Sequence, residues 1–212
     1  MIALVIGATG ATGKDLVAQL IQDSAFEKVR IFVRKSMQIQ HPKLEEIVVD
    51  FAKLSDWAKY LHGDVAFACL GTTLKQAGSK EVQWTIDYDY QYSFAKLAKE
   101  NGVPHFILLS AYGANENSTI FYSKMKGKLE TAIQKLQFSQ LDIFKPGVLI
   151  RKNTNRTSEK LSVGIIRFFN RVGLISKYKP MSTEILAQSM IAYAKKQQPG
   201  LNYVKLQEIF SH

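Results

Sequence analysis

The chain has 212 residues, of which 46% are hydrophobic and 22% are charged, with a formal net charge of +10. These values fit one globular domain and exclude wholesale disorder. A single cysteine excludes an internal disulfide and a cysteine-cluster metal site, and no apolar run reaches the 18 or more residues of a membrane span. Because the chain opens on the strand-like run Ile2–Ile6 without a basic segment before it, we expect no signal peptide and a soluble, cytoplasmic protein.

Short apolar runs alternate with amphipathic stretches over the first 150 residues. The runs have the length and composition of strands buried on both faces. They are Ile2–Ile6, Val29–Val33, Ile47–Val49, Val65–Leu70, Phe106–Leu109 and Leu141–Phe144. Apolar residues at helical spacing follow the first run and precede the fifth and sixth. This repetition predicts an α/β fold, a single Rossmann-type doubly wound parallel sheet with helices on both faces.

The pattern changes after residue 150. A polar stretch is followed by helical patterns near 160–172 and 182–197 and by a last short strand at Tyr203–Leu206. These pieces are too small for a second domain. We therefore expect one NAD(P)-binding domain over residues 1–212, with 151–200 as a small helical extension on the substrate side.

Glycines at positions 7, 10 and 13 lie between the first expected strand and the helix that follows it. Glycine suits such a turn because the chain bends sharply, the backbone approaches a pyrophosphate, and the helix packs closely on the strand. The helix N-terminus adds unpaired N–H groups and a positive dipole end. A P-loop is excluded because Asp15, not Ser or Thr, follows Lys14. The expected cofactor contacts here are Gly7, Thr9, Gly10, Ala11, Thr12 and Gly13, and a glycine-rich turn without a ligand is the alternative.

The second expected strand ends in Arg34 and Lys35, where an NAD enzyme usually has an acid for the ribose hydroxyls. Two cations would instead pair with a 2′-phosphate. This favours NADP(H) over NAD(H), although two solvated surface cations would give the same sequence. Further cofactor contacts are expected where later strands end, at Asp50, Phe51, Leu70, Gly71, Thr72, Thr73, Pro146 and Val148. Cys69 is interpreted as a small buried apolar residue.

Ser110 follows the fifth expected strand, and Tyr122 and Lys126 follow it at helical i, i+4 spacing. A lysine ammonium beside a phenol lowers the phenol's pKa, and a nearby serine hydroxyl can hold a substrate oxygen. We therefore interpret Ser110, Tyr122 and Lys126 as a catalytic trio, with Tyr122 and Lys126 also near the cofactor. A solvated helix face is the alternative.

These motifs, in this order, resemble the short-chain dehydrogenase/reductase superfamily in its extended or atypical branch. The segments 69–73, 108–110 and 144–149 are closer still to its Tat-interacting-protein-like atypical group. The resemblance covers roughly residues 1–150. It implies NADP(H) binding, with Ser110 orienting substrate, Tyr122 as acid/base and Lys126 holding the ribose. Asp87 stands where extended members often have a catalytic Asn, and the Ser-to-Tyr interval is shorter than in the sugar-nucleotide enzymes.

Residues 145–180 contain nine cations and one acid, Glu159, and so carry most of the net charge. A solvated surface is one interpretation. An acidic substrate or a phosphate-bearing partner is the other, with Arg151 and Arg156 as substrate candidates. No nucleic-acid-binding motif accompanies the charge, so no nucleic-acid partner is expected. The four histidines share no metal-ligand spacing, so no metal is expected.

The sequence thus leads to two functional hypotheses. The first is an NADP(H)-dependent oxidoreductase acting on a small carbonyl or alcohol. The second, since the atypical group includes regulators, is a redox-sensing regulatory protein that binds NADP(H) without turnover and acts through a protein partner. A monomer or a homodimer is compatible with either.

Overall fold

The structure is a computed structural model that describes residues 1–53, 56–147, 149–150 and 181–210. The expectations for Val148, Arg151 and Arg156, and for a helix near 160–172, fall outside these residues.

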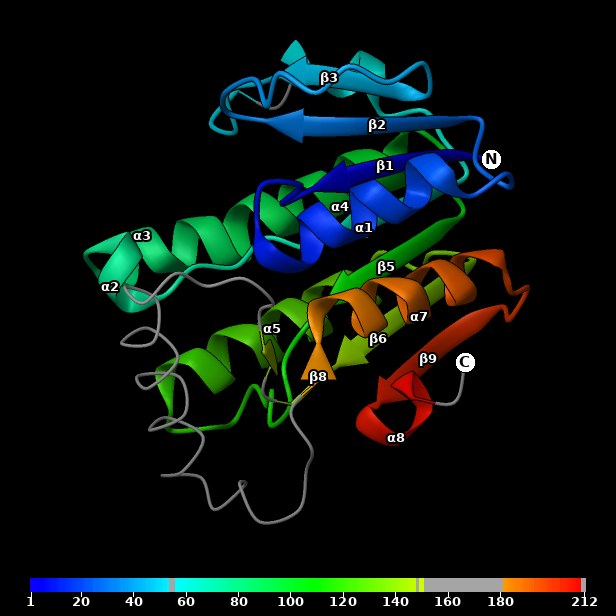
Figure 1. The fold of residues 1–212 in the computed structure, drawn as a ribbon. Coiled ribbons are helices and arrows are strands. Elements are labelled where there is room, and N and C mark those ends of the chain that lie inside the picture. Colours follow the sequence, from blue (N-terminus) through cyan, green and yellow to red (C-terminus); the bar gives the residue numbers. More distant parts are fainter. Residues whose placement is uncertain (54–55, 148, 151–180, 211–212) are drawn as a thin grey trace.

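A seven-stranded sheet forms the centre of the fold, with the order β3-β2-β1-β4-β5-β6-β9 and every neighbouring pair parallel. Its arrowheads point toward the same side in Figure 1. The strands are β1 Ile2–Ile6, β2 Lys28–Val33, β3 Leu44–Val48, β4 Val65–Ala68, β5 His105–Leu109, β6 Gln140–Lys145 and β9 Gly200–Lys205. The order reverses direction between β1 and β4, so the expected doubly wound Rossmann-type fold is confirmed.

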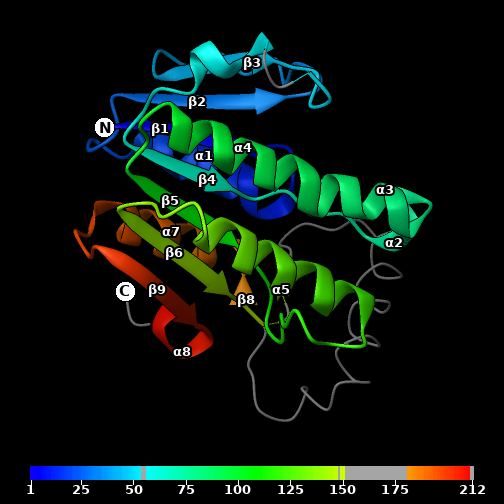
Figure 2. The same cartoon turned by 180° about the vertical axis from the view of Figure 1, so that it is seen from behind.

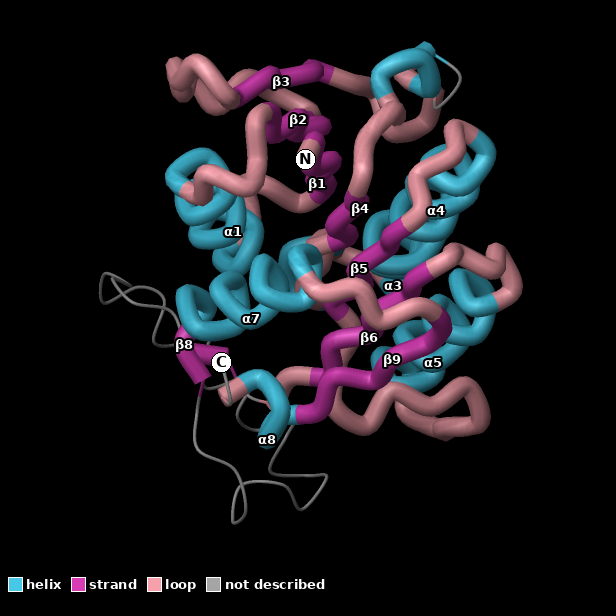
Figure 3. Tube along the Cα trace, turned by 90° about the vertical axis from the view of Figure 1, so that its right-hand side faces the viewer, coloured by secondary structure: helices cyan, strands magenta, loops and turns pink. Residues whose placement is uncertain are grey.

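Helices cover both faces of this sheet (Figures 2 and 3). Helices α1 (Ala11–Gln22) and α7 (Thr183–Lys195) lie on one face, and α4 (Tyr90–Glu100) and α5 (Phe121–Gln134) on the other. Shorter elements connect them. They are the 3-10 turn Ala58–Tyr60, α2 Leu74–Ala77, α3 Lys80–Trp84, the π-helical turn Thr85–Asp89, the two-stranded pair β7 Leu149–Ile150 and β8 Met181–Ser182, and α8 Leu206–Ile209.

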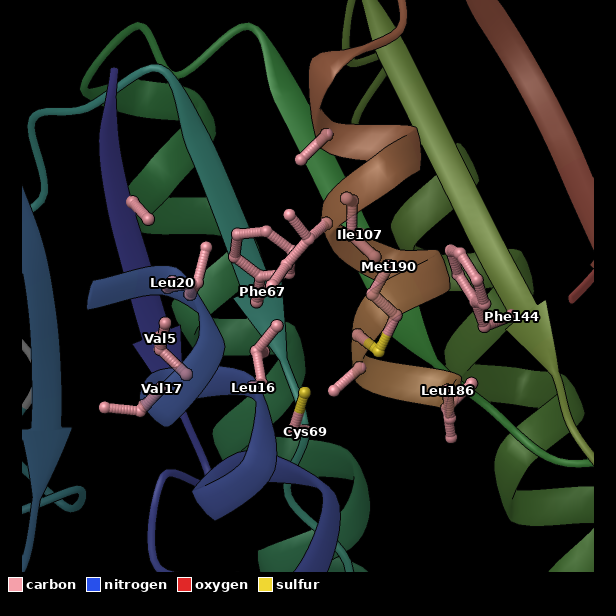
Figure 4. Packing of buried hydrophobic residues seen from close by; sticks show 14 of the residues in the cluster. Val5, Leu16, Val17, Leu20, Phe67, Cys69, Ile107, Phe144, Leu186 and Met190 are labelled. Carbon is pink, nitrogen blue, oxygen red and sulfur yellow. The ribbon is translucent and has the colours of Figure 1, made fainter. Parts of the chain in front are cut away.

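The strands divide their side chains between two apolar cores, because successive residues of a strand point to opposite faces. Phe67 and Ile107 enter the core under α1 and α7, where Leu16, Leu20 and Met190 meet them (Figure 4). Their neighbours along the strands enter the second core, under α4 and α5, with Phe94, Leu129 and Ile133. Burial on both faces explains why the strands read as continuous apolar runs in the sequence.

Helix α7 corrects the expected domain plan. Leu186 and Met190 are fully buried in the same core as α1, so residues 183–195 form part of the helical layer and are not a substrate-side extension. Polar contacts add to this packing. Thr183 Oγ1 donates to Asp15 at 2.5 Å, and Gln19 Nε2 donates to the Glu184 carbonyl oxygen at 3.1 Å.

The ion pair between Asp23 and Lys195, 2.7 Å long, joins the end of α1 to the end of α7 and gives a test of this arrangement. The hydrogen bond from Lys195 lowers the pKa of Asp23 below 3.8. A lowered acid pKa in the folded state stabilises the protein above the unfolded pKa, and this contribution is lost as pH falls through the folded value. We expect Asp23→Asn to lower the free energy of unfolding by about 0.2–1 kcal/mol at pH 7.

Urea denaturation at pH 7 and in strong acid measures the difference, which should disappear in acid. Lys195→Met is the matched control. It should reproduce the loss at pH 7, and the double variant should lose no more than either single one. An equal loss for Asp23→Asn at both pH values contradicts the assignment.

Candidate nucleotide-binding and catalytic site

The glycine loop folds back on itself at the end of β1. Gly7 has φ of +82°, and a Cβ there would lie 2.4 Å from the Cys69 carbonyl carbon. A Cβ at Gly13 would lie 2.0 Å from the Gly7 carbonyl oxygen. The Gly10 N–H donates to that same oxygen at 2.9 Å. Glycine is therefore required at positions 7 and 13 because strand, loop and helix approach within backbone contact.

The N-terminus of α1 faces outward from this loop. Gly10 is its N-cap residue and supplies no side-chain cap, and no acidic residue occupies the first turn. The first N–H groups of a helix have no intrahelical partner, so here they remain available to an anion. Thr9 and Gly10 are exposed, Ala11 is half-buried and Thr12 is buried. This donor set fits the pyrophosphate of a dinucleotide.

Arg34 and Lys35 are exposed directly after β2, the neighbour of β1 in the sheet. Within the described part of the chain, neither side chain forms an ion pair or a hydrogen bond. Because parallel neighbouring strands end at the same edge, both cations lie on the side of the sheet that carries the glycine loop.

The expectation for Phe51 needs a correction. Its ring is 5% exposed and packs against Trp57 and Tyr90 in the second core, so its side chain is not available to stack on an adenine. Asp50 is exposed, and its carboxylate accepts from the Ala52 N–H at 2.9 Å. Of this pair, only Asp50 presents a side chain to a ligand.

The loop after β4 is held by α3 and the π-helical turn. The Thr72 N–H donates to Asp87 Oδ1 at 2.8 Å, and Gln83 Nε2 donates to the Thr72 carbonyl oxygen at 3.0 Å. Thr73 caps α2 by accepting from the Gln76 N–H at 3.2 Å. Of the expected contacts, Gly71 is exposed and Leu70 is partly buried against the second core. Sequence reasoning missed Gln83, since only the tertiary fold brings it to Thr72.

Asp87 is completely buried, and its Oδ2 atom has no hydrogen-bond partner among the described residues. Burial raises the pKa of Asp87, while the positive charge of Lys126 and the Thr72 N–H oppose the shift. Lys126 is 2% exposed, and burial lowers its pKa against the opposing charges of Asp87 and Glu130. Asp87 on the π-helical turn and Lys126 on α5 are thus close enough for the charge of each to act on the pKa of the other.

Tyr122 and Lys126 lie one turn apart on α5, as the i, i+4 spacing predicts. Burial, followed by the negative charge of Asp87, raises the pKa of Tyr122 above its usual value of 10. The expectation that Lys126 lowers the phenol's pKa is therefore wrong for the protein without ligand, because burial and Asp87 dominate.

Ser110 follows β5 directly, is 6% exposed, and donates its N–H to the Phe144 carbonyl oxygen at 2.9 Å. Its hydroxyl donates to Glu130 Oε1. Glu130 lies one turn beyond Lys126 on α5, and its other oxygen accepts from Lys145 Nζ at 2.9 Å. This buried chain of Ser110, Glu130 and Lys145 was missed by sequence reasoning. The one available signal was that Glu130 continues the i, i+4 series of Tyr122 and Lys126.

Two further expectations concern the ends of β4 and β6. Cys69 is buried, and burial raises the pKa of its thiol to about 12, so its interpretation as a small apolar residue is confirmed. Pro146 is buried after β6, and its carbonyl oxygen accepts from the Tyr112 N–H at 3.0 Å. Val148, Arg151 and Arg156 remain outside the described residues.

The described residues offer neither a metal site nor a membrane-spanning helix. They contain no group of three or more His, Cys, Asp or Glu side chains placed to hold a metal ion. Among their helices, none combines the length and the apolar character needed to cross a membrane.

Comparison with known proteins identifies the family. A family model described as NAD(P)H-binding matches residues 7–160. The chain belongs to this NAD(P)H-binding family. It is 38% identical over 150 residues to Protein HTATIP2 of Rattus norvegicus, a match that covers 69% of this chain and 62% of that protein. It is 30% identical over 209 residues to Protein FMP52, mitochondrial, of Candida albicans, covering 95% and 90%. The expected place among atypical short-chain dehydrogenases/reductases, in the HTATIP2-like group, is confirmed.

Solved structures agree on the fold. A UDP-glucose 4-epimerase of Thermotoga maritima, solved with UDP-glucose, superposes with a TM-score of 0.72 at 13% identity, over 97% of this chain and 76% of that one. A short chain dehydrogenase of Burkholderia cenocepacia in complex with NADP gives 0.68 at 14% identity, over 95% and 86%. At these identities the likeness concerns the fold alone.

The expected cytoplasmic location is contradicted. Relatives from Eremothecium gossypii, at 36% identity over 152 residues, and from Candida albicans are named mitochondrial proteins.

The glycine loop provides the second test. Gly13→Ala places a methyl group 2.0 Å from the Gly7 carbonyl oxygen, and Gly7 cannot retreat because it already touches the backbone of Cys69. We expect a loss of about 1–3 kcal/mol in the free energy of unfolding and a loss of NADPH binding. Gly71→Ala is the control for stability, since an added Cβ there meets nothing within 4 Å. Thermal unfolding and NADPH fluorescence titration measure both effects, and a Gly13→Ala protein that is as stable as Gly71→Ala contradicts the assignment.

Proposed function

We propose that this protein is an NADP(H)-dependent oxidoreductase that interconverts a small carbonyl compound and its alcohol. The observation that carries the proposal is the meeting of three elements at one edge of the sheet. These are the glycine loop after β1, Ser110 after β5, and the face of α5 that carries Tyr122 and Lys126.

The residues for holding the cofactor follow from the donor groups at this edge. The glycine loop and the first turn of α1 would hold the pyrophosphate, and Arg34 and Lys35 would pair with the 2′-phosphate. Lys126 would bind the ribose, and the loop at Thr72 would border the nicotinamide end. When bound, the cofactor supplies or accepts the hydride.

Tyr122 is the proposed proton donor. Its raised pKa keeps the phenol protonated near neutral pH, so it can donate a hydrogen bond to a substrate oxygen and then transfer the proton as negative charge develops there. The buried ammonium of Lys126, one turn away on α5, would stabilise the phenolate left behind. Ser110 would hold the same substrate oxygen from the β5 side.

A regulatory protein that binds NADP(H) without turnover, and signals through a protein partner, is the second candidate. One observation favours it, because the pKa of Tyr122 is shifted away from the working range of a general base. The small-molecule substrate of the first candidate is proposed to be anionic, from the cations of residues 145–180. The two candidates share cofactor binding and differ in turnover.

Cofactor preference gives the third test. A charge-assisted contact to the 2′-phosphate should make NADPH bind more tightly than NADH by about 1–2 kcal/mol, which is roughly five- to thirtyfold in Kd. Arg34→Ala should remove most of this difference and leave the NADH affinity unchanged. Lys28→Ala, at the opposite end of β2, should preserve the preference. Fluorescence titration measures the affinities of the parent protein and both variants for NADPH and NADH, and equal Kd values in the parent protein refute the assignment of Arg34 and Lys35.

Turnover gives the fourth test and separates the two candidates. A panel of small carbonyl substrates, neutral and anionic, is screened by NADPH absorbance. Tyr122→Phe should reduce kcat at least about a hundredfold, because it removes the proton donor, with NADPH binding intact. Tyr88→Phe, which removes a phenol hydroxyl from a ring that stacks on Trp84, should keep full activity. NADPH binding without turnover on any substrate, or full activity in Tyr122→Phe, rejects the enzymatic proposal.

A further inference from the structure

Ser110 is the residue whose hydrogen-bonding direction the structure defines most narrowly. Its hydroxyl is buried and points to Glu130 Oε1, while Glu130 Oε2 accepts from Lys145 Nζ at 2.9 Å. Glu130 is itself 5% exposed. Lys145 is fixed in turn by a second hydrogen bond, to the Ala114 carbonyl oxygen at 3.2 Å. The three side chains form one chain from the β6 end to the substrate side of β5.

The chemical type of each group determines which one donates in the hydrogen bonds between Lys145, Glu130 and Ser110. A lysine ammonium has donors only, and a carboxylate has acceptors only. Glu130 accepts from Lys145 Nζ at Oε2 and from the Ser110 hydroxyl at Oε1, so Ser110 supplies the proton of the bond between them. Its single hydrogen is thereby committed to Glu130, and only the lone pairs of Oγ remain for a ligand.

From this geometry we infer that Glu130, balanced by Lys145, is a positioning residue that makes Ser110 a hydrogen-bond acceptor, so that the site binds the alcohol form of its substrate more tightly than the carbonyl form. The inference rests on the proposed function, in which Ser110 and Tyr122 face the same substrate oxygen. A carbonyl oxygen then accepts one hydrogen bond, from Tyr122. An alcohol accepts that bond and also donates its own hydrogen to Ser110.

The variant Glu130→Gln should invert this preference without changing the shape of the side chain. Lys145 offers only donors, so the glutamine must turn its carbonyl oxygen to Lys145 and its amide nitrogen to Ser110. The amide then donates to Oγ, and the Ser110 hydrogen becomes free for a ligand. A carbonyl ligand gains a hydrogen bond, and an alcohol loses the acceptor for its hydrogen.

The test measures binding of two unreactive probes of similar size to the NADPH-loaded protein. They are tert-butanol, which carries a hydroxyl hydrogen, and dimethyl sulfoxide, which carries only an acceptor. Binding is preferable to turnover as a readout, because the overall equilibrium constrains the ratio of the two kcat/KM values. The measured quantity is the Kd of dimethyl sulfoxide divided by the Kd of tert-butanol. Both Kd values are obtained from the fluorescence of bound NADPH.

One net hydrogen bond corresponds to about a three- to tenfold change in affinity. The ratio in the parent protein should exceed that in Ser110→Ala by this factor, and the ratio in Glu130→Gln should fall below that in Ser110→Ala. The double variant should match Ser110→Ala. An unchanged ratio in Glu130→Gln overturns the inference, because a purely structural role of Glu130 would alter both Kd values together.

Failure of the inference can be distinguished from failure of the proposed function. If Ser110→Ala changes neither Kd, or neither probe binds, then Ser110 does not face the ligand and both proposals are rejected. The proposed function stands if Tyr122→Phe abolishes turnover and Ser110→Ala weakens the binding of tert-butanol. If Glu130→Gln then keeps the parent ratio of the two Kd values, only the inference is rejected. Should Glu130→Gln fail to fold, a neutron structure of the deuterium-exchanged parent protein with NADPH decides. The Ser110 deuteron should lie toward Glu130, and a deuteron pointing elsewhere overturns the inference.

Discussion

Backbone contact between the glycine loop and the end of β4 is the constraint on which the site depends. Gly7 touches the backbone of Cys69, and Gly13 touches Gly7, so β1, β4 and α1 meet without any intervening side chain. Because of this close contact, the first turn of α1 lies at the carboxyl edge of the sheet, with its N-terminus directed outward. The contact also fixes the end of β4, from which the loop at Thr72 extends to Asp87. The glycine loop and the loop at Thr72 therefore start from one junction between β1, β4 and α1.

The proposed catalytic end of the site contains charges that are costly to bury. Asp87, Lys126 and Glu130 are each at most 5% exposed, and Lys145 completes the set beside Glu130. An isolated buried charge costs several kcal/mol, so each of these groups depends on its neighbours of opposite sign. The uncompensated remainder is the Oδ2 atom of Asp87, which has no hydrogen-bond partner within the described part of the chain. Such a residue is tolerated where a ligand or a proton can complete it, which agrees with its position between Thr72 and Lys126.

The parts of this design that are local in sequence could be predicted, and the parts that depend on tertiary contacts could not. The glycines of the loop are recognisable because their close packing involves positions within seven residues of one another. The buried strands are recognisable as apolar runs because helices cover both faces of the sheet. Glu130, by contrast, meets Ser110 and Lys145 across sequence separations of 20 and 15 residues. Phe51 follows a strand end as expected, yet Trp57 and Tyr90 close over its ring. Burial and the charge of Asp87 raise the pKa of Tyr122, and they outweigh Lys126, the lysine of the same motif.

The position of α7 bears on the basic segment, residues 151–180, which precedes this helix in the sequence. Strands β7 and β8, which flank residues 151–180 in the sequence, pair in parallel, with Leu149 opposite Met181 and Ile150 opposite Ser182. The ends of a segment with eight cations and one acid are thus held together, after β6 and before a helix bonded to α1 through Thr183 and Asp15. Because α1 begins at the glycine loop, this attachment connects the charged segment to the helix proposed to hold the cofactor. In the proposed function, the cations of residues 151–180 would attract a phosphate-bearing cofactor or an anionic substrate, an effect that operates over about 10 Å at 0.1 M salt.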